Sequence, residues 1–163
     1  MKKLLLAFAG LALIGQSLFA DISLSLGASS VSVEDESGTE FAIGLGTDNL
    51  KGQDSGIYWG QRLEFGKGTV GDYDSITYGA TGKLGYIFTS DLSVYGAVAF
   101  AMQEINDIDC YGWAPGIGVN YKLHDSVTLN LEYMSYTLTP DENGYAGDDI
   151  DLDRATLRLA YNF

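Results

Sequence analysis

The sequence of 163 residues predicts an all-β protein, an eight-stranded antiparallel up-and-down β-barrel. Three observations lead to the all-β class, and a resemblance described below leads to the barrel. Apolar and polar residues alternate in eight segments, and a period of two is the side-chain period of a β-strand. Glycine occurs 21 times, whereas proline occurs only twice. After residue 20, no window is long and apolar enough to form a membrane-spanning helix.

The first twenty residues have the features of a secretory signal peptide. Lys2 and Lys3 precede an apolar run from Leu4 to Ile14, and Ala20 supplies a small residue at the expected cleavage site. A basic start, a short apolar run and a small residue are typical of such leaders. We therefore expect an exported protein, with a signal peptide at 1–20 and one β-barrel domain at 21–163.

Eight amphipathic segments follow the leader, and each is predicted to form one strand of a hairpin series. The predicted apolar faces are Ile22, Leu24 and Leu26; Phe41, Ile43 and Leu45; Ile57, Trp59, Leu63 and Phe65; Ile76, Tyr78, Ala80, Leu84, Tyr86 and Phe88; Leu92, Val94, Val98, Phe100 and Met102; Tyr111, Trp113, Ile117, Val119, Tyr121 and Leu123; Val127, Leu129, Leu131 and Tyr133; and Leu157, Leu159, Tyr161 and Phe163.

The predicted connections differ between the two ends of these strands. At one end we expect tight turns at 89–91 and 124–126 and a longer polar connection at 47–56. At the other end we expect mostly longer acidic or glycine-rich loops at 34–38, 67–74, 106–110 and 139–151. Two residues break the pattern. Gln61 falls on an apolar face, which suggests a bulge, and Pro115 must cost a ladder hydrogen bond or mark a bulge.

The content of the second face decides whether the apolar face lies inside or outside. This second face is rich in Gly, Ala and Ser, as the narrow interior of an eight-stranded barrel requires. It also carries charges that must pair if they are enclosed, because an unpaired buried charge is very costly. The predicted lumenal charge network consists of Arg62, Glu64, Lys83, Lys122, Glu132, Arg154 and Arg158.

Aromatic residues on the apolar face gather near the strand ends, as in the girdles of membrane-spanning barrels. One predicted girdle contains Trp59, Tyr86, Phe88, Tyr121, Tyr161 and Phe163, and the other contains Phe65, Tyr78, Tyr111, Trp113 and Tyr133. The lumenal small residues and these girdles together predict a transmembrane barrel. A secreted soluble barrel with the apolar face inside, binding an apolar ligand, is the alternative.

The amphipathic strand from Leu157 to Phe163 resembles the C-terminal signature of bacterial outer-membrane β-barrels. The resemblance extends to small eight-stranded members such as the OmpA transmembrane domain, OmpX and the opacity-like porin family. It implies that Tyr161 and Phe163 belong to a signal for the outer-membrane assembly machinery, and that the chain lies in the cell outer membrane. Unlike full-length OmpA, the protein is expected to have no peptidoglycan-binding domain after the barrel.

Two groups of residues suggest chemistry. His124 and Ser126, with Glu132 as the nearest carboxylate, are similar to the catalytic arrangement of lipid A deacylases, which are also eight-stranded barrels. However, the predicted turn lies on the periplasmic side and Glu132 points into the lumen, so an ordinary turn is the favoured interpretation and no catalytic residue is assigned.

The second group is acidic and would bind a divalent cation only weakly, because its spacing is not that of an EF-hand. It consists of Asp141, Glu142, Asn143, Asp148, Asp149, Asp151 and Asp153. Cys110 is the single cysteine, which excludes an internal disulfide, and its sequence neighbours include no basic group that would activate the thiol. No cofactor or metal is expected.

The net charge of −13, which becomes more negative when the leader is removed, excludes nucleic acid and anionic membrane surfaces as partners. Eleven Tyr, seven Phe and two Trp argue against a disordered acidic chain. We expect a monomeric structural or surface-interaction protein that contacts outer-membrane lipid, lipopolysaccharide and a host or cell-surface ligand. A lipid A-modifying enzyme and a narrow channel are the alternatives.

Overall fold

The computed structural model describes residues 21–33, 36–105, 108–140 and 149–163. The predicted signal peptide, the predicted loop residues 34–35 and 106–107, and the acidic residues at 141–148 lie outside the described residues. Among the described residues, no helix is long and apolar enough to cross a membrane.

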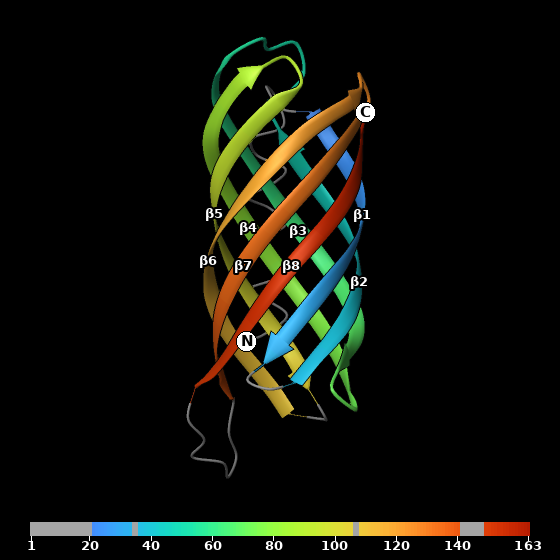
Figure 1. The fold of residues 1–163 in the computed structure, drawn as a ribbon, viewed down its shortest axis with the longest axis vertical. Coiled ribbons are helices and arrows are strands. Elements are labelled where there is room, and N and C mark those ends of the chain that lie inside the picture. Colours follow the sequence, from blue (N-terminus) through green and yellow to red (C-terminus); the bar gives the residue numbers. More distant parts are fainter. Residues whose placement is uncertain (1–20, 34–35, 106–107, 141–148) are drawn as a thin grey trace.

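Eight antiparallel strands form one closed barrel in chain order, which confirms the predicted fold class (Figure 1). Each strand pairs with its sequence neighbours, and β1 also pairs with β8 to close the sheet. The strands are β1 (Asp21–Val33), β2 (Glu36–Asp48), β3 (Gly56–Val70), β4 (Tyr73–Thr89), β5 (Leu92–Ile105), β6 (Ile108–His124), β7 (Val127–Pro140) and β8 (Ile150–Asn162).

The two ends of the barrel are named here by their connections. At the turn end, which is uppermost in Figure 1, the predicted tight turns are confirmed at Ser90-Asp91 and Asp125-Ser126, and segment 49–55 joins β2 to β3. The start of β1 and the end of β8 also lie at this end, since Ser23 pairs with Asn162. The opposite end is the loop end.

The predicted loops at the loop end are too long, because the strands continue through them. Most of 67–74 belongs to β3 and β4, which are joined by Gly71-Asp72 alone; Gly71 has a φ of 57°, a left-handed conformation that favours glycine. Residues 36–38 belong to β2 and 108–110 to β6. The predicted loop 139–151 likewise loses Thr139 and Pro140 to β7, and Ile150 and Asp151 to β8.

The two irregular residues do not produce bulges. The register of β3 with both neighbours is continuous through Gln61, so the suggested bulge is wrong. Pro115 pairs with Val98 of β5, but pairing with β7 stops at Trp113 and resumes in the same register at Gly116. Because proline has no N–H to donate, the ladder loses bonds here without a shift of register. The register shifts that do occur lie beside the two tight turns.

A broad outer belt of the barrel is apolar, as the sequence predicts. Leu26, Leu84 and Ile117 are 65%, 66% and 66% exposed, and large apolar side chains of every strand share this outer face. Soluble monomers rarely expose such a continuous apolar surface, because burying it would stabilise them. The belt therefore has the character of a surface that contacts lipid, and it contains the aromatic residues of both predicted girdles.

Toward the loop end, the strands extend past the belt and the pattern of their two faces inverts. We call this part the collar. Its outward residues are polar apart from Ile76, and its inward residues include the apolar Val31, Val70, Ala101, Cys110, Leu138 and Leu152, which are at most 3% exposed, beside the hydrogen-bonded polar pair Ser75 and Gln103. The outward residues of the collar are Ser30, Ser32, Ser37, Thr39, Lys67, Thr69, Asp74, Glu104, Asp109, Ser135, Thr137, Thr139, Asp151 and Asp153.

Candidate functional site: the lumenal charge network

The middle of the lumen is filled by charged side chains that alternate with lipid-facing residues. Arg62 and Glu64 flank outward Leu63 on β3, and Arg154 and Arg158 occupy lumenal positions on β8. A period of two directs each of these charges inward on strands whose other face is apolar. Lys83 and Glu132 enter from β4 and β7, and the side chains of these six residues are at most 9% exposed.

Glu64 is the carboxylate with the most ionic partners. It accepts hydrogen bonds from Nε of Arg62 at 3.0 Å, from Nη2 of Arg158 at 2.8 Å and from Nη1 of Arg154 at 3.4 Å. Three guanidinium groups on two strands therefore converge on one carboxylate. Charge-assisted bonds of this kind offset the cost of taking the ions out of water.

Glu132 is the second centre of the network. Both of its oxygens accept hydrogen bonds from the guanidinium of Arg62, and Nζ of Lys83 lies 3.6 Å from Oε2. The hydroxyl of Tyr95 donates to the same oxygen at 2.9 Å, and the Lys83 ammonium lies 4.8 Å from the centre of the Tyr95 ring. Because Arg62 contacts both glutamates, the two centres form one connected network across β3, β4, β5, β7 and β8.

Glu40 of β2 is a third carboxylate of the network, and it was not among the residues predicted from the sequence. Its Oε2 accepts a hydrogen bond from Thr77 at 2.6 Å and lies 3.4 Å from Nη2 of Arg154. The signal was present in the sequence, because Glu40 precedes Phe41 in an alternating segment and so shares the face of Ala42 and Gly44. A Cβ at Gly66 would meet the Glu40 carboxylate, so this glycine makes room for the acid.

Lys122 was predicted to belong to this network, but the structure places it at the turn end. Its ammonium lies 3.0 Å from Oδ1 of Asp125 in the β6–β7 turn, and its side chain is 24% exposed. A hydrogen bond from Lys122 and its positive charge lower the pKa of the Asp125 carboxyl. This is a solvent-exposed pair, and such pairs contribute little to stability.

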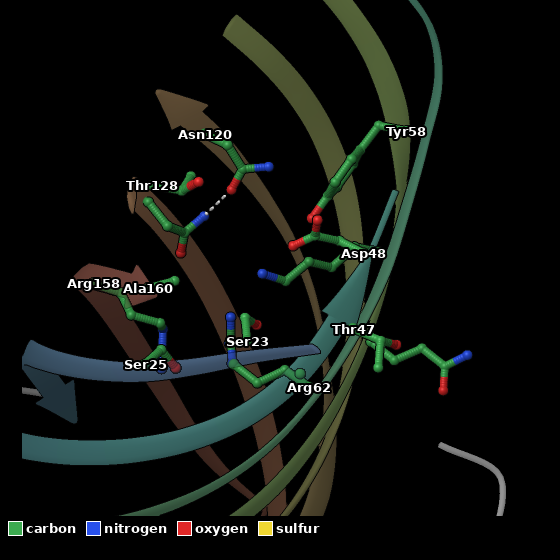
Figure 2. Close-up of a pocket in the computed structure, with 14 residues that line it drawn as sticks. Ser23, Ser25, Thr47, Asp48, Tyr58, Arg62, Asn120, Thr128, Arg158 and Ala160 are labelled. Atoms are coloured by element: carbon green, nitrogen blue, oxygen red, sulfur yellow. Dashed lines mark hydrogen bonds between the residues drawn. The ribbon is translucent and has the colours of Figure 1, made fainter. Parts of the chain in front are cut away.

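On the turn-end side of the charge network, the lumen is polar and holds a small cavity. Figure 2 shows side chains that line this space, among them Asp48, Arg62, Asn120 and Arg158. The cavity volume is about 30 Å³, which is enough for about two water molecules. Asn130 donates a hydrogen bond to Oδ1 of Asn120 at 2.9 Å, so neutral polar groups line it beside the charged ones.

At the loop end, the apolar inward residues of the collar close the lumen on that side of the charge network. Val31, Leu138 and Leu152 are fully buried, and they belong to one cluster of buried apolar residues with Val70 and Cys110. The lumen thus has three layers along its axis: apolar in the collar, ionic in the middle and polar at the turn end.

The other candidate residues are not assembled into a catalytic group. His124 is exposed at the turn end, whereas Glu132 is buried in the lumen with Arg62, Lys83 and Tyr95 as its partners. Among the described residues there is no group of three or more His, Cys, Asp or Glu that would hold a metal ion. Asp149 and Asp151 accept hydrogen bonds from Thr139 and Thr137, and the buried Cys110 thiol contacts the Ile108 carbonyl at 3.9 Å.

The two residues of the predicted assembly signal lie on the outer face of the barrel, beside the seam between β8 and β1. Tyr161 and Phe163 are exposed, and their ring centres lie 5.1 Å apart in an edge-to-face arrangement. The backbone N–H of Phe163 donates to the carbonyl of Ile22 at 2.9 Å. Recognition by an assembly machinery remains an expectation of the resemblance.

A closed eight-stranded barrel with an apolar outer belt and an ionic lumen defines a membrane-spanning barrel of the outer membrane. Residues 4–163 match the family described as outer membrane protein beta-barrel domain, and the chain belongs to that family. The protein is therefore an outer-membrane protein, as the sequence predicts. Comparison with curated proteins finds no match.

Solved structures of small outer-membrane barrels are similar in fold. Ail, the attachment invasion locus protein of Yersinia pestis, is 16% identical with a TM-score of 0.53, over 88% of this chain and 97% of that chain. The N-terminal barrel domain of Pseudomonas aeruginosa OprF is 15% identical with a TM-score of 0.53, over 88% of this chain and 99% of that chain. The outer membrane enzyme PagL is 10% identical with a TM-score of 0.54, over 85% of this chain and 99% of that chain. At these identities the likeness shows the fold alone, and the group includes an enzyme as well as proteins not described as enzymes.

Proposed function

We propose that this outer-membrane barrel is a non-catalytic surface-interaction protein, which anchors a rigid collar outside the bilayer and binds its partner there. The observation that carries the proposal is the inversion of the two strand faces in the collar. An apolar interior and a polar exterior are features of a water-exposed β-barrel, so the collar is built to stand in water as a rigid continuation of the membrane domain. Longer extracellular loops are typical of such proteins, and the longest connection, between β7 and β8, lies at the collar end, which supports a collar on the cell surface.

The chemistry of the collar favours a cationic partner. Its outward acidic residues are Asp74, Glu104, Asp109, Asp151 and Asp153, whereas Lys67 is its outward basic residue among the described positions. The negative electrostatic potential of these carboxylates attracts positively charged surfaces and repels anionic ones, over roughly 8–10 Å at physiological salt. Surface hydroxyls of Ser and Thr on β1, β2 and β7 supply neutral hydrogen-bonding groups beside the acids.

The collar is tested with cells that display the protein and with amine-coated or sulfonate-coated particles as probes. We expect wild-type cells to retain amine-coated particles more strongly than cells without the protein, and salt to weaken the retention. A variant with Asp74→Asn, Asp151→Asn and Asp153→Asn should lose most of the gain at equal surface expression. Equal retention by this variant, or a preference for sulfonate-coated particles, would contradict the proposal.

The layered lumen favours this role over a channel. A conducting path would have to pass the buried apolar side chains of the collar and then seven paired charges, before it reaches the polar part of the lumen with its cavity of about 30 Å³. Discrete conductance steps of the purified barrel in planar bilayers would favour the channel instead. The separation of His124 from Glu132 does not favour lipid A hydrolysis. If cells that carry the protein contained altered lipid A, and cells with a Ser126→Ala variant did not, the result would favour the enzyme.

A further inference from the structure

The polar cavity on the turn-end side of the charge network is lined by cationic side chains from three strands. They are Arg62 of β3, Lys83 of β4 and Arg158 of β8. Figure 2 shows Arg62 and Arg158 among the side chains around this space. What the cavity can bind depends on the hydrogen bonds and the charge that these groups leave uncompensated.

Two of the three cations lack acceptors for their N–H groups. Arg158 is 3% exposed and donates from Nη2 to Glu64, but its buried Nε and Nη1 have no hydrogen-bond partner among the described residues. Lys83 forms an ion pair with Glu132 at 3.6 Å, which is longer than a hydrogen bond, and its side chain is 9% exposed. Arg62 differs from both, because its guanidinium donates to Glu64 and Glu132. The cavity wall therefore offers unused cationic donors.

The buried charges of the network do not sum to zero. Among the described residues, the four cations Arg62, Lys83, Arg154 and Arg158 face the three carboxylates Glu40, Glu64 and Glu132. One positive charge is therefore in excess, and an uncompensated charge in a buried site is very costly. The excess lies beside the cavity, because Lys83 and Arg158 are the cations with unused donors there.

Asp48 is the carboxylate that lines the cavity, and it lies at the edge nearest the turn end. It pairs with Asp21 at the start of β1, and it is partly exposed. Its Oδ1 accepts a hydrogen bond from the backbone N–H of Leu50 at 3.1 Å. Because water and the β2–β3 connection share its charge, Asp48 compensates the buried excess only in part.

We propose that this cavity binds a chloride ion, which is held by Lys83 and by the unused N–H groups of Arg158. The volume of about 30 Å³ holds about two particles of the size of water, so polyatomic anions such as phosphate are too large. The second particle is a water molecule, which donates to the buried Oδ1 of Asn130, an acceptor without a partner among the described residues. Two water molecules would satisfy the same donors but would leave the positive charge in excess.

Urea unfolding of the purified barrel in detergent micelles tests the site, with sodium chloride and sodium gluconate compared at the same sodium concentration. Gluconate is too large for the cavity. We expect wild-type protein to unfold at higher urea concentration in chloride. Once most sites are occupied, each tenfold rise in chloride should shift the folding equilibrium by about tenfold, the limit for one bound ion. In crystals grown with sodium bromide, an anomalous peak is expected between Lys83 and Arg158.

Two variants should remove the difference between the two salts. Lys83→Gln removes the excess positive charge, whereas Ala160→Val fills the cavity from β8 without any change of charge. The matched control is Lys122→Gln, which removes the same charge from the exposed pair with Asp125 and should keep the chloride effect. Folding of each variant is verified by the change in gel mobility between unheated and boiled samples.

Equal stability of wild-type protein in the two salts would overturn the proposal, because water alone would then fill the cavity. A chloride effect that persists in Ala160→Val, or that disappears in Lys122→Gln, would also overturn it, since the ion would then act elsewhere. Bromide crystals without an anomalous peak between Lys83 and Arg158 would have the same meaning. These results do not depend on the collar or on its partner, because the site lies in the lumen.

Discussion

Glu64 is the residue on which the packing of the lumen depends most. Its carboxylate is bonded to Arg62, Arg154 and Arg158, and each of these guanidinium groups is at most 5% exposed. Neutralising the carboxylate therefore leaves three buried cations with fewer counter-charges. Loss of one partner from a buried ionic group is far more costly than loss of a surface ion pair.

We predict that Glu64→Gln lowers the free energy of unfolding by about 3–5 kcal/mol, the usual cost of breaking a buried pair. Urea unfolding in detergent micelles, followed by gel mobility, measures this difference. The control is Asp74→Asn on the exposed outer face of the collar, which should change stability by less than about 0.5 kcal/mol. Equal effects of the two substitutions would mean that water screens the lumenal charges.

At this scale, a period of two in the sequence was enough to place Arg62, Glu64, Lys83, Glu132, Arg154 and Arg158 on the lumenal face. It could not say which charges pair, because partners such as Arg62 and Glu132 are 70 residues apart and meet only after the barrel closes. Lys122 shows a second limit. It has the correct face, but its height along the barrel places it beside Asp125, and height follows from the register of the whole sheet.

At the scale of the element, β7 shows how one strand serves two solvents. Leu131 and Tyr133 face outward in the belt, whereas Thr137 and Thr139 face outward in the collar. Tyr136 and Leu138 alternate with those threonines, point inward and are at most 2% exposed. The position at which outward residues change from apolar to polar marks the boundary between lipid and water on this strand.

We predict that Leu131→Arg and Thr137→Arg differ strongly in their effect on stability, although both add the same side chain to the outer face of β7. Arginine in the middle of the belt should cost about 2–4 kcal/mol, and close to nothing in the collar, where water solvates it. Unfolding in lipid vesicles measures both values. Similar costs at the two positions would contradict the boundary drawn here.

The inversion also explains why the strand ends were predicted poorly. Segment 67–74 contains two glycines, two aspartates and few large apolar residues, which is typical of a loop. The structure pairs most of it across β3 and β4, because Val70 fills the interior of the collar and Lys67 and Thr69 face water. Local composition indicated a loop, whereas the strand is stabilised by neighbours distant in the sequence.

At the scale of the whole molecule, the barrel has a belt in lipid, an ionic lumen and a water-exposed collar that is closed inside by apolar side chains. Alternation predicted the eight strands, the small lumenal residues and the aromatic girdles predicted the outward apolar face, and the resemblance of the last strand to outer-membrane barrels predicted the closed barrel. The collar was not predicted, because it depends on a register that only the assembled sheet defines.

Labelling of intact cells with a maleimide too large to cross the outer membrane tests this arrangement most directly. In a Cys110→Ala background, single cysteines replace Thr137 in the collar, Leu131 in the belt and Asp125 in the β6–β7 turn. The account predicts labelling of Thr137→Cys in intact cells, of Asp125→Cys only after permeabilisation, and of Leu131→Cys in neither. Labelling of Asp125→Cys but not Thr137→Cys would reverse the orientation, and labelling of Leu131→Cys would contradict the lipid-facing belt.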